Sequence, residues 1–99
     1  MKVEEEFNRI KLRLLESRQL LVKTQFEELD GLLNISKIAN IYFNKSHSWM
    51  QHKINSRFVS NKVQVFKKEE LKTLAQAYRD ISSSLIKYAE QIEYTIKEL

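Results

Sequence analysis

The chain has no proline and only one glycine, Gly31, in 99 residues. Tight hairpins and long loops normally need both residue types, because proline fixes a turn and glycine adopts backbone conformations that other residues resist. A β-sandwich is therefore disfavoured, and long helices are favoured. With 42% apolar residues the chain can bury one modest core. The sequence predicts an all-α fold.

Apolar residues recur at spacings of three and four in two long segments, residues 3–30 and 67–97, which predicts two long amphipathic helices. Gly31 can supply the left-handed residue that ends the first helix. The second segment keeps its apolar spacing for four heptads, with Leu71, Leu74, Tyr78, Ile81, Leu85, Tyr88, Ile92, Thr95 and Leu99.

Two short helices are expected between the long ones. Ser36 is a suitable N-cap for a helix over residues 37–43, and Ser46 for a second over 47–55. Asn44 between them can adopt a left-handed turn. A connection over residues 56–66 follows, as a small β-hairpin or an extended segment. We expect one helix-turn-helix-like domain over residues 1–99: a long helix at about 3–30, the helix-turn-helix at about 36–55, the connection at about 56–66 and a long helix at about 67–97.

Charge is distributed unevenly along the chain. Residues 31–68 hold no acidic residue and seven basic ones, whereas residues 1–30 carry a net charge of −1 and residues 69–99 a net charge of −2. The central segment thus supplies more than the whole net charge of +4. A field of one sign on one module suggests a polyanionic partner, of which nucleic acid is the commonest.

Two short helices joined by a tight turn form a helix-turn-helix pattern, whose second helix enters the major groove of DNA. Polar side chains on one face of that helix could read base edges; they are His47, Ser48, Gln51, His52 and Asn55. Residues expected to contact phosphates are Lys37, Lys45, Ser46, Lys53, Arg57 and Lys62. The pattern departs from the usual spacing, because Ala39 lies five residues before Asn44 and the turn has no glycine. An ordinary helical hairpin is the alternative.

Several of these residues also resemble a known family. The segments are Ile35-Ser36-Lys37-Ile38-Ala39 and Tyr42-Phe43-Asn44-Lys45-Ser46-His47-Ser48-Trp49, with Phe66, Glu69, Glu70 and Leu71 at the start of the last helix. The chain resembles a domain-of-unknown-function family of short helix-turn-helix-like proteins from Bacteroides-type bacteria and their mobile elements. The resemblance covers roughly residues 33–85, and it implies the fold more than an activity.

Other kinds of site find little support. His47 and His52 are the only histidines, their spacing of five differs from that of a helical metal pair, and there is no cysteine. No nucleophile–base pair or glycine-rich phosphate loop is present, so we expect neither an enzyme nor a cofactor. Trp49 could stack on a base, but core packing is favoured.

We therefore expect a non-enzymatic protein that binds double-stranded DNA, as a small transcriptional regulator or a mobile-element accessory protein. The alternative is a helical protein–protein interaction or assembly module. A homodimer through the C-terminal helix is expected, because Leu85, Tyr88, Ile92 and Leu99 extend beyond a short core. No membrane and no small-molecule substrate is expected. Lack of cysteine and of an apolar signal sequence at the start indicates the cytoplasm.

Overall fold

The computed structural model describes residues 19–99, apart from the side chain of Phe58. Residues 19–28 are helical and bury Val22 and Phe26, which lie four residues apart on one face. The helix ends in a turn at residues 29–32, where Gly31 has a φ of 80°. The predicted helix over 3–30 is thus confirmed over its last third, while residues 3–18 lie outside the described part.

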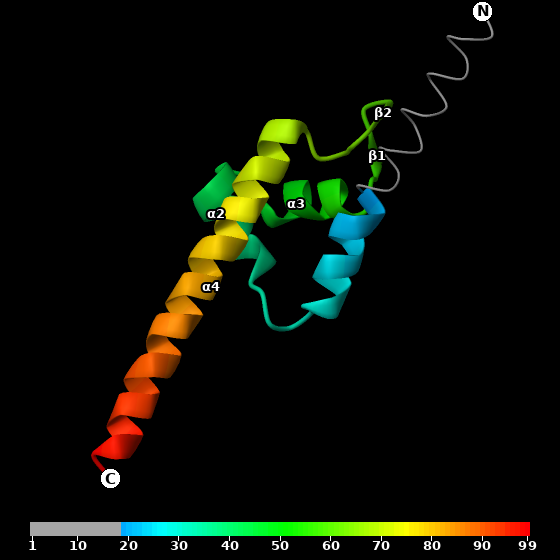
Figure 1. Ribbon diagram of the computed structural model, residues 1–99. Helices are drawn as coiled ribbons and strands as arrows, with labels where there is room; N and C mark the ends of the chain where they lie inside the picture. Colours follow the sequence, from blue (N-terminus) through cyan, green and yellow to red (C-terminus); the bar gives the residue numbers. More distant parts are fainter. Residues whose placement is uncertain (1–18) are drawn as a thin grey trace, which may run out of the picture. The chain divides into compact units, whose positions relative to one another are not determined.

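The first short helix, α2, spans Ile35–Phe43 and buries Ile38 and Ala39 (Figure 1). Its N-cap is Asn34, whose side-chain oxygen accepts a hydrogen bond from the backbone N–H of Lys37 at 3.0 Å. The sequence-based assignment of Ser36 as the cap was therefore wrong by two residues. Asparagine caps a helix as well as serine does, so the two candidates could not be separated by residue type.

The second short helix, α3, spans His47–Ile54 and follows α2 after three residues. Asn44 adopts the expected left-handed conformation, with φ 53° and ψ 43°, and its N–H bonds to the carbonyl of Asn40. Ser46 caps α3 as predicted, because its Oγ accepts the N–H of Trp49 at 3.1 Å. α2 and α3 pack against each other, and α3 buries Met50 and Ile54.

A two-stranded antiparallel hairpin follows α3, with β1 at Phe58–Val59 and β2 at Lys62–Val63. Its tip consists of Ser60 and Asn61, which both have positive φ, 52° and 63°. Left-handed residues at both central positions match the twist of a two-residue hairpin. The predicted connection near residues 58–66 is therefore a short β-ribbon.

The buried side chain of Gln19 connects the helix at residues 19–28 with two distant parts of this region. Its Nε2 donates to the carbonyl of Lys53 at 2.8 Å and to Oγ of Ser56 at 2.9 Å. Its Oε1 accepts the N–H of Phe66 at 2.9 Å. The side-chain amide thus satisfies buried polar groups at the end of α3 and after the hairpin, which would otherwise cost free energy on folding.

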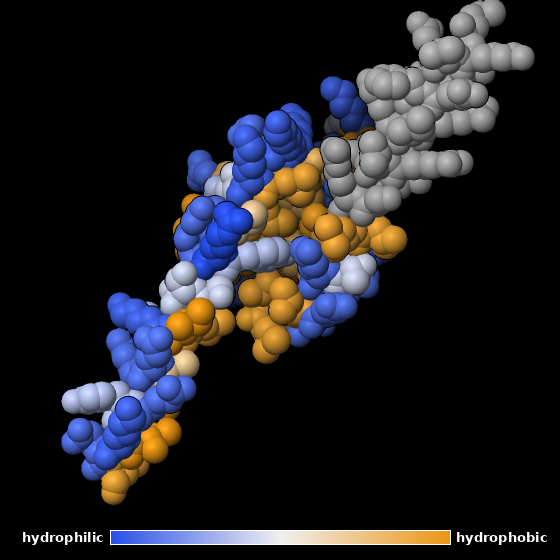
Figure 2. All heavy atoms as spheres, in the orientation of Figure 1, coloured by the Kyte–Doolittle hydropathy of each residue, from blue (hydrophilic) through white to orange (hydrophobic). Residues whose placement is uncertain are grey.

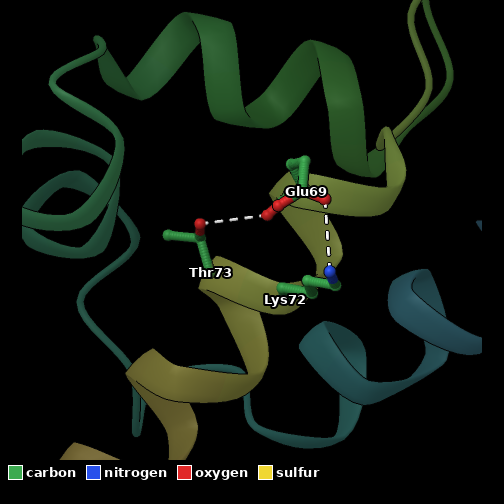
Figure 3. A network of polar contacts seen from close by, with 3 residues as sticks. All are labelled: Glu69, Lys72 and Thr73. Carbon is green, nitrogen blue, oxygen red and sulfur yellow. Dashed lines mark hydrogen bonds and ion pairs between the residues drawn. The ribbon is translucent and has the colours of Figure 1, made fainter.

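The chain divides into two compact units, Met1–Phe66 and Lys67–Leu99. The second unit is one helix, α4, which spans Lys68–Lys97. Lys67 precedes it without a side-chain cap, but Glu70 Oε1 accepts the N–H of Lys67 at 2.8 Å. In the first turns Glu69 forms an ion pair with Lys72 at 3.2 Å, and Thr73 Oγ1 donates to the Glu69 carbonyl (Figure 3).

Burial changes along α4. Leu74 and Ala77 are buried, and burial raises the pKa of the Tyr78 hydroxyl above its usual value. From residue 82 onwards every side chain is exposed, including apolar ones that stand out as orange patches among blue near the C-terminus in Figure 2. No helix in residues 19–99 combines the length and apolar character needed to cross a bilayer. The all-α fold class is confirmed.

Candidate nucleic-acid interface

Four basic side chains of the acid-free segment are exposed within the first unit. Lys37 lies in the first turn of α2, Lys45 in the turn before α3, Arg57 at the start of the hairpin and Lys62 on β2. They come from α2, the turn after it and the hairpin, all in one compact unit, and no acidic residue lies in sequence between them. Each can therefore offer a positive charge to solvent, as contact with a phosphate requires.

The first turn of α3 is exposed and polar. Ser46, His47 and Ser48 are all accessible. Nδ1 of His47 is hydrogen-bonded to Oγ of Ser36 at 2.9 Å, which joins the starts of α2 and α3. Because N-terminal residues of a helix carry backbone N–H groups with no partner inside the helix, this end favours an anion.

Two further candidate base-reading residues, Gln51 and Asn55, are half-buried and bonded to each other. Asn55 Nδ2 donates to both the backbone carbonyl and Oε1 of Gln51, each at 3.0 Å. Both residues line an open pocket of about 400 Å³ whose wall includes Glu27 and Asp30. Two carboxylates beside the pair make this side of α3 less favourable for a phosphate backbone than the first turn.

His52, the fifth base-reading candidate, is half-buried near the end of α3. Its backbone carbonyl accepts the N–H of Arg57 at 3.0 Å, and the Arg57 carbonyl accepts the N–H of Gln64 at 2.9 Å. The first bond joins the start of the hairpin to the end of α3, and the second closes the base of the hairpin itself. The backbone that carries Arg57 therefore has a defined position relative to α3.

Lys53 differs from the other predicted phosphate contacts. Its side chain is only 6% exposed, and its Nζ donates to the carbonyl of Val65 at 2.9 Å. The ammonium also lies 5.4 Å from the centroid of the Trp49 ring, within the range of a cation–π interaction. A lysine held in this way is poorly placed to contact a phosphate, so the structure disfavours the predicted phosphate contact at Lys53.

Trp49 is half-buried, which fits the packing role favoured by the sequence better than stacking on a base. Its ring centroid is 5.2 Å from that of Phe43, with an interplanar angle of 43°. Lys45 Nζ lies 6.0 Å from the same ring. The indole thus connects the end of α2, the turn and the buried Lys53.

A model of a family described as a domain of unknown function, DUF5053, matches residues 22–92. The chain belongs to the DUF5053 family. The match includes α2, α3, the hairpin and most of α4, so the candidate interface lies within the family's domain. Comparison of the DUF5053 chain with curated proteins and with solved structures found no match in either.

The resemblance to a family of unknown function is thereby confirmed, whereas the helix-turn-helix character and bacterial range of that family stay predictions. In the described part of the DUF5053 chain no group of three or more histidine, cysteine or acidic side chains could hold a metal ion. Sequence reasoning missed the structural role of Gln19, since a polar residue in an amphipathic helix is normally assigned to the solvent side. No local signal distinguishes it.

Proposed function

We propose that the DUF5053 domain binds double-stranded DNA through a helix-turn-helix formed by α2, the turn at residues 44–46 and α3. The observation that carries the proposal is the first turn of α3. It presents Ser46, His47 and Ser48 to solvent beside exposed Lys45, while Met50 and Ile54, further along the same helix, are buried. A helix held by its apolar side and polar at its exposed N-terminal end has the character of a groove-reading helix.

Backbone contacts would come from Lys37, Lys45, Arg57 and Lys62, together with the hydroxyl of Ser46. Arg57 and Lys62 would add two exposed cations on the hairpin, whose start is hydrogen-bonded through the backbone of Arg57 to the end of α3. Base contacts are assigned first to His47 and Ser48, which are exposed, and then to His52. Gln51 and Asn55 would have to exchange their mutual hydrogen bond for a base edge.

In this proposal the protein is non-enzymatic and cytoplasmic, and is either a small transcriptional regulator or a mobile-element accessory protein. The resemblance of residues 33–85 to short proteins from bacteria and their mobile elements favours the second role. The alternative, an interaction module whose basic surface meets an acidic protein, uses the same exposed lysines. An interaction with an acidic protein gives the capped, polar N-terminal end of α3 no function. DNA binding gives it one, so DNA is the better-supported partner.

The test is a fluorescence-anisotropy titration of a random-sequence duplex at several salt concentrations between about 50 and 200 mM. Four neutralised phosphates predict that log K falls with log salt at a slope of about −4. Lys45→Gln should make the slope less steep by about 1, because one phosphate contact is lost. Lys87→Gln, on α4 outside the acid-free segment, is the matched control and should leave the slope unchanged.

Absence of binding at about 50 mM salt and tens of micromolar protein would reject DNA as the partner. In that case a pull-down onto acidic polypeptides such as poly-glutamate would be expected to retain the protein through the same lysines. Equal effects of Lys45→Gln and Lys87→Gln would show that the contact is not made by the α2–α3 region.

A further inference from the structure

A row of apolar side chains on the last half of α4 and at the C-terminal residue just after it is exposed, and we call it the apolar stripe. It consists of Leu85, Ile86, Tyr88, Ile92, Ile96 and Leu99, each at least 55% exposed. Leu85, Ile92, Ile96 and Leu99 follow one line along the helix by their spacing of three, four and seven, and Ile86 and Tyr88 flank that line on either side. Lys87, Glu90, Gln91 and Glu98 lie elsewhere on the circumference. An apolar row of this length, bordered by polar residues, is typical of an interaction site.

We propose that the apolar stripe is covered by α4 of a second copy of the chain, packed antiparallel as a two-helix coiled coil. This inference goes beyond DNA binding and does not depend on it. Side chains of this size bury roughly 100 Å² each, so six from each copy remove on the order of 1,200 Å² from water. That total reaches the range of specific protein–protein interfaces.

The sizes of the residues favour the antiparallel direction. Ser82 and Ala89 are small and seven residues apart, and they alternate with Leu85 and Ile92 in a heptad pattern. In an antiparallel pair centred near residue 87, Ala89 of one copy faces Leu85 of the other, and Ser82 faces Ile92. In a parallel pair each small residue would face its own equivalent and leave a gap, which costs packing energy.

Charge leads to the same arrangement. Arg79 and Glu93 are both exposed and lie at the same heptad position, seven residues before and after Ile86. In the antiparallel register Ile86 lies beside Ile86 of the second copy, so each Arg79 lies beside a Glu93. Exposed ion pairs add little stability, but flanking charges of opposite sign select the orientation of paired helices.

The oligomeric state is tested by sedimentation equilibrium of the full chain at about 1 to 100 µM. We expect a dimer, whereas the single chain has a mass of 11.9 kDa. Ile92→Asp buries a carboxylate in the pair and should raise the dissociation constant on the order of 100-fold. Lys87→Asp places the same carboxylate on the polar side of α4 and should leave dimerisation within about threefold, with circular dichroism confirming that both variants fold.

The direction of the helices is tested by disulfide trapping, which the absence of natural cysteines makes straightforward. Leu85→Cys and Ala89→Cys proteins are mixed, left to exchange and oxidised. The antiparallel register predicts a mixed disulfide between the two variants as the main product. Homotypic disulfides in place of it would contradict the antiparallel direction. A monomer at every concentration, with α4 covered by its own chain or left uncovered, would overturn the proposal altogether.

Discussion

Two lysines of the acid-free segment show how the same residue type takes opposite roles. Lys37 is exposed in the first turn of α2, whereas Lys53 is buried against the Val65 carbonyl and the Trp49 ring. The sequence places Lys53 four residues after Trp49, which allows the contact but does not require it. Its burial depends on the hairpin returning Val65 to α3, and that is a tertiary event.

Replacing each of these lysines by alanine should therefore give different results. Lys53→Ala removes a buried hydrogen bond and stem packing, and should lower the free energy of unfolding by about 1–3 kcal/mol. It should leave the salt slope of DNA binding unchanged under conditions where the protein is folded. Lys37→Ala should change stability by less than about 0.5 kcal/mol and make the slope less steep by about 1.

Urea unfolding followed by circular dichroism, together with anisotropy titrations, measures both quantities on the same preparations. An undiminished stability of Lys53→Ala combined with a reduced salt slope would contradict the buried role of this ammonium. It would restore Lys53 to the phosphate contacts.

At the scale of elements, most features of the turn between α2 and α3 could be predicted from the sequence. Asn44 and Ser46 are residue types with strong local preferences, for the left-handed conformation and for the N-cap respectively, and both are used in that way. The start of α2 was misplaced because Asn34 and Ser36 are equally good caps. The pocket beside Glu27 could not be foreseen, because it depends on packing against the helix at residues 19–28. The Gln51–Asn55 bond joins residues four apart, a spacing that allows such a bond without requiring it.

Substitutions of Asn44 test the conformation of this turn. Because its φ is 53°, Asn44→Gly should be neutral or stabilise the protein slightly, while Asn44→Val should lower the melting temperature. The expected loss for valine is about 1–2 kcal/mol, since a β-branched side chain resists the left-handed region. Asn40→Val, at an exposed position inside α2, controls for valine's own helix propensity. Equal losses at both positions would mean that the turn conformation is not what Asn44 contributes.

At the scale of the whole chain, the division into two units separates two kinds of surface. The first unit holds the exposed cations of the candidate interface, and the second holds the apolar stripe. Charge counting and heptad spacing predicted both regions from sequence, because composition is a property of a segment and needs no contacts. The sequence alone does not show which part of α4 is free to pair with a second copy. The side-chain exposures of the structure are needed for that, because the first half of the helix buries Leu74 and Ala77.

Hydrogen exchange should distinguish these units as a function of protein concentration. If α4 pairs with a second copy, the amides of residues 82–97 should exchange more slowly at about 100 µM than at about 1 µM. The amides of α3 should exchange at the same rate at both concentrations, which makes them the internal control. Concentration-independent exchange throughout α4 would speak against the antiparallel pair.

Gln19 has a practical consequence for anyone who shortens this protein. The family match begins at residue 22, three positions after the side chain that bonds to Ser56 and to the backbone of Lys53 and Phe66. A fragment trimmed to the matched residues would lose that amide and leave the Lys53 carbonyl and the Phe66 N–H without their partner. The smallest self-sufficient version of the first unit therefore begins before the point where sequence similarity to the family becomes detectable.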